Sequence, residues 1–191
     1  IGDSIDKAEV LHKMMFNKKR ILSKLAEMHT LDIYSRIMCD LPEVFEYSVF
    51  KDLLKIELMD PNISKEKHEA YEEVIWLLDS FYDIQFKHDS DISERVIFPV
   101  SDVESRGIED ARFVRFVDDG SESVMGTYTA YNGHSVLSKL ITTEDFYTFR
   151  IMPLHGEGSQ SKGMALFPKK IKGKYAMLGR VDGVNNYLMY S

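Results

Sequence analysis

Two acidic residues, Glu109 and Asp110, stand side by side where a strand-like run, Ala111–Val117, begins. A positioned carboxylic acid can give a proton to the leaving group of a reaction. Because successive side chains on a strand point to opposite faces, only one of the two acids can face a given site. By spacing alone the pair also fits turn and strand-start residues that accept hydrogen bonds from backbone amides, and that interpretation is the simpler one.

A basic residue, Lys162, lies in a glycine-rich loop, residues 156–163, just ahead of another strand-like run. Glycines let the backbone approach a ligand closely, and the ammonium group could hold an anion. The loop is not a phosphate-binding P-loop, because the Gly-Lys-Ser/Thr order and the following helix are missing. A solvated loop lysine fits the same local pattern.

A third polar group, Arg180, Asp182 and Asn185, follows the apolar run Tyr175–Leu178. Sugar hydroxyls require planar polar groups of this kind, but such residues are also ordinary in hairpins. Three aromatic residues could form a stacking platform for a sugar ring, although aromatic residues on strands more often fill a core. They are Tyr128, Tyr131 and Phe146.

Composition excludes several classes of function. The 191 residues carry 24 basic against 31 acidic side chains, a net charge of −7, so there is no overall attraction for nucleic acid or anionic lipid. Cys39 is the single cysteine, which rules out an internal disulfide and a cysteine-based metal site. The six histidines lack metal-ligand spacing, and no dinucleotide motif is present. We expect no metal, organic cofactor, nucleic acid or membrane partner, and a bacterial cytoplasmic location.

The residues before position 81 have a helical pattern. Apolar residues recur at helical spacing from Leu11 onward, Asn17 and Ser64 are candidate N-caps, and a further helix is predicted over Ser48–Met59. A set of methionines is expected to fill the core of this helical part. They are Met14, Met15, Met28 and Met38.

The residues after position 81 form short strand-like runs separated by turn signals such as Asp119-Gly120 and Asn132-Gly133. No helix-length pattern separates the runs, so we predict an antiparallel sheet. The predicted strands are Ala111–Val117, Met125–Tyr131, Val136–Thr142, Tyr147–Met152, Met164–Phe167, Tyr175–Leu178 and Tyr187–Ser191. Their spacing suits two successive propeller blades, and it suits a sandwich equally well.

Three stretches decide between these alternatives by resemblance. They are Ser93–Val100 (SERVIFPV), Gly107–Phe116 (GIEDARFVRF) and Lys162–Arg180 (KGMALFPKKIKGKYAMLGR), with TYTAYNG at 127–133 between them. From about Asp83 to Ser191 the chain resembles the long members of glycoside hydrolase family 130. The preceding helical part resembles, more weakly, an insertion carried by those members. The resemblance implies an α+β chain, with a helical segment at 1–81 followed by part of a five-bladed β-propeller at 82–191.

The resemblance also implies a site and a reaction. Family members act on β-mannosides, and most transfer mannose to inorganic phosphate with inversion. The family's catalytic acid falls on Asp110, and its sugar and phosphate pocket falls on Arg112, Lys162 and Arg180, with Asp182 and Asn185 as neighbouring polar residues. The histidine that usually precedes the arginine is replaced here by Gly179.

Two rivals to a mannoside phosphorylase therefore stay open. One is a β-mannoside hydrolase that uses water, and the other is a propeller that binds carbohydrate without turnover. Because the chain starts at Ile1 and ends in the strand-like run Tyr187–Ser191, we expect an internal, inactive piece of a longer enzyme. Unpaired sheet edges in such a piece would favour association between copies, so we expect a homo-oligomer.

Overall fold

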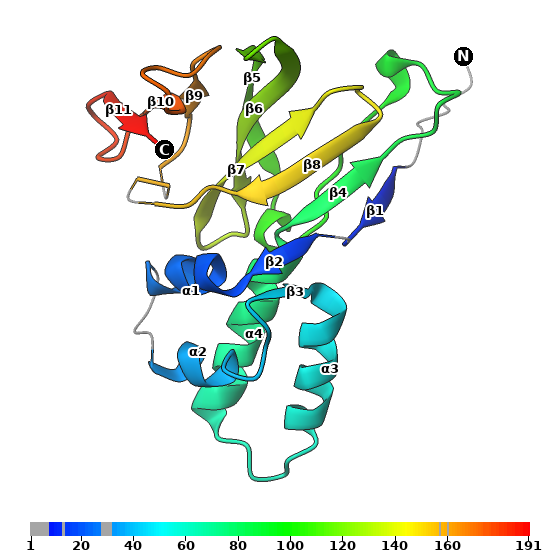
Figure 1. Ribbon diagram of the computed structural model, residues 1–191, viewed down its shortest axis with the longest axis vertical. Helices are drawn as coiled ribbons and strands as arrows, with labels where there is room; N and C mark the ends of the chain where they lie inside the picture. Colours follow the sequence, from blue (N-terminus) through cyan, green and yellow to red (C-terminus); the bar gives the residue numbers. More distant parts are fainter. Residues whose placement is uncertain (1–7, 13, 28–31, 157, 160) are drawn as a thin grey trace. The chain divides into compact units, whose positions relative to one another are not determined.

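The computed structural model describes residues 8–12, 14–27, 32–156, 158–159 and 161–191 (Figure 1). The chain forms two compact units. One comprises the residues up to Leu11 together with Ser80–Ser191, and the other is His12–Asp79. Most of the strands lie in the first unit, and all the described α-helices lie in the second.

The main sheet of the first unit has six strands in the order β1-β4-β8-β7-β6-β5, and every described pair is antiparallel. The strands are β1 (Glu9–Leu11), β4 (Tyr82–Gln85), β5 (Ile108–Asp118), β6 (Ser121–Tyr131), β7 (Val136–Thr143) and β8 (Thr148–Pro153). Strands β5 to β8 are joined in sequence by hairpins. The β5–β6 connection is the two-residue turn Asp119-Gly120, whose φ angles of 46° and 85° are those of a type I′ turn.

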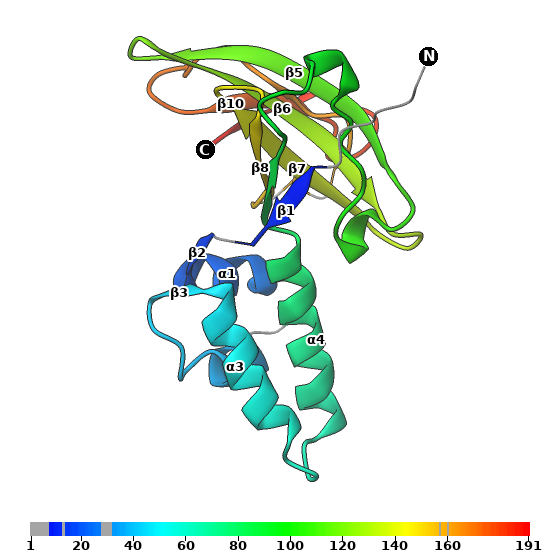
Figure 2. The same ribbon diagram turned by 90° about the vertical axis from the view of Figure 1, so that its right-hand side faces the viewer.

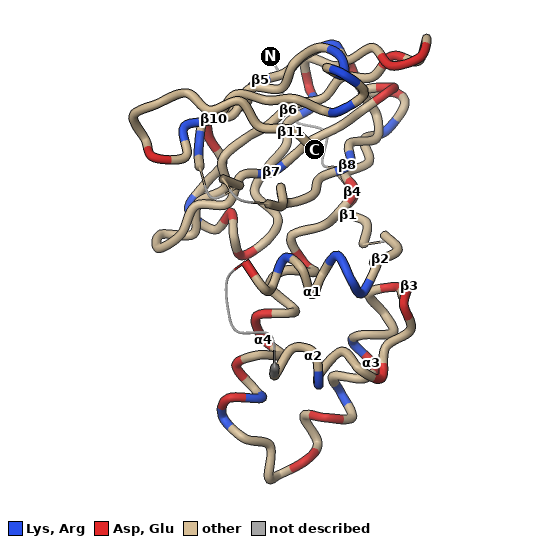
Figure 3. Tube along the Cα trace, turned by 60° about the vertical axis from the view of Figure 1, so that its left-hand side comes forward, with Lys and Arg blue, Asp and Glu red and all other residues tan. Residues whose placement is uncertain are grey.

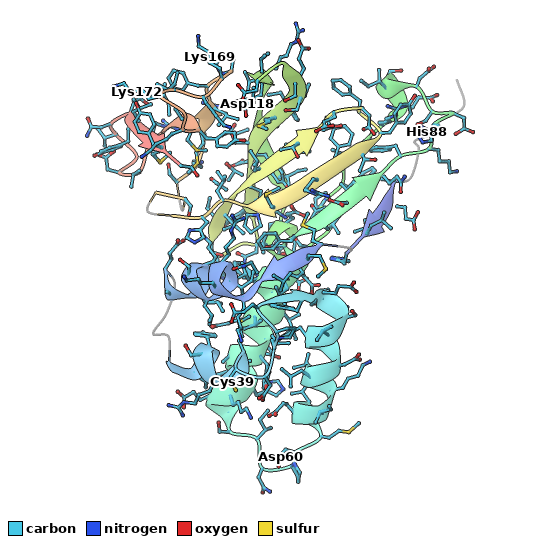
Figure 4. All side chains as sticks on the ribbon, viewed as in Figure 1. Cys39, Asp60, His88, Asp118, Lys169 and Lys172 are labelled. Carbon is cyan, nitrogen blue, oxygen red and sulfur yellow. The ribbon has the colours of Figure 1, made fainter. Side chains whose placement is uncertain are left out.

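A smaller sheet in the same unit has the order β11-β10-β9 and is also antiparallel. Its strands are β9 (Ala165–Leu166), β10 (Ala176–Gly179) and β11 (Tyr187–Tyr190). The segment between β9 and β10 reaches the β5–β6 hairpin, where Lys170 forms an ion pair of 2.6 Å with Asp118 and the Val117 amide donates to the Pro168 carbonyl. Figure 4 shows Asp118 and Lys169 on these neighbouring segments. All seven predicted strands are present, and the predicted antiparallel pairing is confirmed.

The second unit contains four helices and a two-stranded ribbon. The helices are α1 (Lys18–Ala26), α2 (Asp32–Ile37), α3 (Tyr47–Leu58) and α4 (Lys65–Asp79), and the ribbon pairs β2 (Met15–Asn17) with β3 (Val44–Glu46). Helices α3 and α4 run side by side (Figures 1 and 2). Acidic and basic residues are interspersed along both (Figure 3). Both predicted N-caps are confirmed, because Asn17 accepts from the Arg20 amide and Ser64 from the Lys67 amide.

The prediction that residues 1–81 are helical is wrong in part. Three short strands, β1, β2 and β3, lie within that range, and β1 pairs with β4 of the main sheet. The methionine prediction is also wrong in part, since Met38 is fully buried but Met15 is 58% exposed. Alternation explains this, because the β2 strand turns Phe16 inward and leaves Met15 on the other face. Met28 lies outside the described residues.

The core of the first unit contains a charged network that the sequence analysis did not predict. Glu104, at the end of the short 3-10 helix η2 (Asp102–Glu104), and Lys139 of β7 are both fully buried and form an ion pair of 2.8 Å. The hydroxyl groups of Tyr82 and Tyr128 donate to the same carboxylate at 2.9 and 2.7 Å. The Val100 amide donates to it at 2.8 Å, so every polar group of this network has a partner.

This network determines the protonation state of Glu104. Burial by itself would raise the pKa of Glu104, but the Lys139 ammonium and the hydrogen bonds from Tyr128 and Val100 lower that pKa to about 2. Burial lowers the pKa of Lys139 to about 8, against the opposing attraction of Glu104. Burial raises the pKa of Tyr128, so its hydroxyl stays protonated and acts as a donor.

We expect acid to destabilise the first unit through Glu104. Its pKa is lower in the folded chain than the ordinary value of 4.5, so its contribution to stability is complete above pH 4.5 and is lost as the pH falls toward 2. In urea titrations at a series of pH values, the Glu104→Gln variant should show a weaker dependence of the unfolding free energy on pH over that range. The same dependence in parent and variant would contradict this assignment.

A double-mutant cycle tests the ion pair itself. Glu104→Gln leaves the Lys139 charge buried without its partner, which should cost about 3 kcal/mol of unfolding free energy. Adding Lys139→Met removes that charge and should recover part of the loss. A double variant as unstable as the sum of both single variants would show that the two side chains are not coupled.

Candidate active site

Asp110 lies in a β-bulge of β5. The pairing of β5 with β6 shifts between Glu109, which faces Thr129, and Arg112, which faces Thr127, so Asp110 and Ala111 together oppose Tyr128. Asp110 has φ of 57°, the left-handed region that residues other than glycine rarely adopt. Its side chain is exposed. Bulges that re-aim a side chain, and residues held at positive φ, both cluster at functional sites.

Arg112 and Arg180 converge on Gly163. The Arg112 guanidinium donates to the Gly163 carbonyl at 2.9 Å. A Cβ placed on Gly163, whose φ is 69°, would lie 3.3 Å from a terminal nitrogen of Arg112 and 3.6 Å from one of Arg180. Two guanidinium groups from β5 and from the end of β10 therefore stand beside one glycine, and they concentrate positive charge there.

Lys162 adds a third basic group to this place. Its ammonium lies 3.7 Å from the Glu109 carboxylate, and both side chains are 56% exposed. The ion pair links the glycine-rich loop to β5 at the residue directly before Asp110. Thus four of the predicted residues, Asp110, Arg112, Lys162 and Arg180, lie on segments that meet at Gly163.

Asp182 and Asn185 do not join this cluster through any described contact. The Asp182 carboxylate accepts from the amides of Val184 and Asn185 at 2.9 and 2.8 Å, from the Asn185 side chain at 2.7 Å and from the Tyr187 hydroxyl at 2.8 Å. The hydrogen bonds from these groups, the Asn185 amide first, lower the pKa of Asp182. These contacts close the turn between β10 and β11.

The loop that carries Lys162 is held by hydroxyl groups that the sequence analysis missed. Thr127 of β6 donates to the Met164 carbonyl at 2.6 Å, and Ser138 of β7 donates to the Ser161 carbonyl. The Ser161 hydroxyl in turn accepts from the Arg180 amide at 3.2 Å. Thr127 and Ser138 are buried, but β6 and β7 carry other polar residues, so the sequence alone holds no signal that would identify these two.

The three aromatic residues predicted as a stacking platform for a sugar ring do not come together. Tyr128 is buried with its hydroxyl on Glu104, whereas Tyr131 donates to the Gly133 carbonyl and Phe146 lies in the turn before β8. Strand alternation explains the difference, because Tyr128 and Tyr131 are three positions apart and so face opposite sides of β6.

A comparison with protein families identifies the family of the chain. The family model described as beta-1,4-mannooligosaccharide phosphorylase matches residues 28–191. The chain belongs to glycoside hydrolase family 130. The match begins well before Asp83, so it also covers most of the helical unit. No curated protein matches the chain.

Family 130 membership gives the basic cluster a chemical context, because the family acts on glycosides and its phosphorylases use phosphate. The described residues hold no cluster of His, Cys, Asp or Glu suited to a metal ion. Among the same residues, no helix is long and apolar enough to cross a membrane. A cavity of about 530 Å³ lies within the helical unit, between residues of α2, α3 and α4, and none of the predicted site residues lines it.

Replacing Asp110 should reveal the backbone strain at the bulge. Asp110→Gly places at φ 57° the one residue that tolerates it freely, so the unfolding free energy should rise by about 0.5 kcal/mol or more. Ala111→Gly is the matched control, because that neighbouring position has no positive φ and no charged side chain, and glycine in a strand should cost about 0.5–1 kcal/mol there. Urea titration measures both, and a loss of equal size in the two variants would show that Asp110 is not strained.

Proposed function

We propose that this family 130 chain acts on β-1,4-linked mannosides by inverting phosphorolysis, with Asp110 as the general acid. The observation that supports the proposal is that Asp110 occupies a bulge of β5 at positive φ, in sequence between Glu109, which pairs with Lys162, and Arg112, which bonds to Gly163. The family match supplies the substrate class, since its model is described by a mannooligosaccharide phosphorylase.

The proposed reaction needs one protein carboxyl group. Asp110 gives its proton to the glycosidic oxygen as the bond between that oxygen and the anomeric carbon breaks. A phosphate oxygen forms the new bond to the anomeric carbon from the opposite face, which inverts the configuration and yields mannose 1-phosphate. Phosphate supplies the nucleophile, so the second carboxylate of an ordinary inverting glycosidase is not required.

The basic cluster is the proposed phosphate site. Guanidinium groups bind phosphate through paired N–H donors, and an ammonium adds a compact charge. Arg112 and Arg180 already stand together beside Gly163, where an anion would reduce their mutual repulsion. Asp182 and Asn185 bond to each other in the turn that follows Arg180, so we propose that they shape this turn rather than hold the phosphate.

The proposal includes a fold. Strands β5 to β8 are four consecutive antiparallel strands, as in one propeller blade, in a sheet that β4 and β1 extend to six strands, and β9 to β11 form three strands of a second sheet. We propose that they belong to a five-bladed propeller whose central pocket contains Asp110. The antiparallel sheets support this arrangement.

Hydrolysis is the second candidate, and Gly179 favours it. Family phosphorylases have a histidine there that helps to hold phosphate. A Cβ on Gly179 would lie 2.5 Å from the Met189 methyl carbon, so Met189 occupies the space that a side chain needs. Water would then replace phosphate as the nucleophile, with Asp110 still the acid and a second carboxylate required to take the proton of the attacking water.

The Asp110→Asn variant tests the general acid in the complete protein that contains this chain. Asparagine keeps the shape but cannot donate the proton, so turnover of mannooligosaccharides should fall by about 10²–10⁴-fold while substrate binding changes little. Product analysis with and without phosphate separates mannose 1-phosphate from free mannose. Near-parental turnover in the variant would refute the assignment. If the parent binds mannosides but turns over none, the chain is part of a binding propeller.

Lys162→Ala tests the phosphate site. Loss of one charge-assisted contact should raise the apparent KM for phosphate by about tenfold or more. Lys169→Ala is the matched control, because Lys169 is exposed on the segment between β9 and β10 (Figure 4) and should leave that constant unchanged. Equal KM values for phosphate in the two variants would show that Lys162 does not bind phosphate.

A further inference from the structure

We propose that Tyr128, held by Glu104, is a positioning residue that fixes the β-bulge carrying Asp110. The inference rests on the proposed role of Asp110 as the general acid. It assigns a function to the buried hydrogen bond between Tyr128 and Glu104, which no part of the proposed reaction uses directly.

The strand register places Tyr128 at the bulge. Thr129 pairs with Glu109 and Thr127 pairs with Arg112, so Tyr128 is the single residue of β6 opposite the two residues Asp110 and Ala111. A displacement of Tyr128 would therefore first move the two bulge residues opposite it. The Tyr128 side chain is 5% exposed, and its hydroxyl donates to Glu104 at 2.7 Å.

Glu104 in turn fixes the chain that leads into β5. Its carboxylate accepts from the Val100 and Ser101 amides at 2.8 and 3.1 Å, and its carbonyl accepts from the Gly107 amide at 2.7 Å. The Gly107 carbonyl then accepts from the Tyr131 amide at 3.1 Å. One buried residue thereby holds both the segment before Asp110 and the β6 residue opposite it.

The network is suited to this task because its members are buried and bond to one another. A hydroxyl or carboxylate withdrawn from water must keep its hydrogen bonds, so Tyr128 and Glu104 are confined to one arrangement. Backbone at positive φ in a residue other than glycine persists only where surrounding structure holds it. The hydrogen bond between Glu104 and Tyr128 provides that support at the β6 position opposite Asp110.

Tyr128→Phe is the test, with Tyr82→Phe as its matched control. Both changes delete one hydroxyl that donates to Glu104, but Tyr82 lies on β4 and pairs with Ile151 of β8, away from the bulge. In the complete protein, Tyr128→Phe should lower kcat for mannoside cleavage by about 100-fold and leave KM nearly unchanged, because misplacement of a reacting group costs that much. Tyr82→Phe should lose similar thermal stability and keep near-parental kcat.

The outcomes separate this inference from the proposed function. If Asp110→Asn abolishes turnover and Tyr128→Phe matches Tyr82→Phe in kcat, Tyr128 does not position the acid and the inference is wrong. If Asp110→Asn leaves turnover intact, the proposed function fails, and the inference is decided by nuclear magnetic resonance on the 191-residue chain. There the φ-dependent coupling at the Asp110 amide should change in Tyr128→Phe alone, and an unchanged coupling overturns it. Should Tyr128→Phe not fold, Glu104→Gln replaces it and should act in the same direction.

Discussion

The carboxylate of Glu104 is the interaction on which the first unit depends. It is buried and charged, and it is bonded to Lys139 on β7, Tyr128 on β6 and Tyr82 on β4. Three strands that are not all adjacent are thus tied through one anion, in a place where water cannot substitute for a lost partner. A charge in that position is tolerated only with complete hydrogen bonding, so the network permits a single arrangement of these strands.

That constraint extends to the candidate site through the covalent chain. Glu104 is six residues before Asp110, and the intervening turn is closed by hydrogen bonds to β6. On the other face of the same strands, Thr127 and Ser138 donate hydrogen bonds to the loop of Lys162. The loop and the bulge are therefore both held by the same sheet. A site assembled from a strand, a loop and a turn is positioned because all three are fastened to β6 and β7.

Local sequence pattern predicted much of this fold but little of the site. The hairpins follow from Asp-Gly and alternating residues, and Asn17 and Ser64 mark helix starts, because these signals act within a few residues. The β1 strand was missed because three residues, Glu9–Leu11, carry no periodicity, and they acquire strand geometry only by pairing with β4. The bulge was missed because Asp110 occupies a position where glycine would be the usual signal. The burial of Lys139 could not be predicted from local pattern, since its partner Glu104 is 35 positions away.

One residue connects the fold to the choice between phosphate and water. Gly179 is buried at the end of β10, and Met189 of the paired strand β11 fills the space beside it. A histidine there would therefore have to displace the Met189 side chain, so the packing of the two positions is coupled. The clash is with the flexible end of a methionine rather than with backbone, and a modest rearrangement would relieve it. In the proposed reaction, the choice of nucleophile involves the packing between β10 and β11 as well as Arg112 of β5, whereas proton donation involves the bulge of β5.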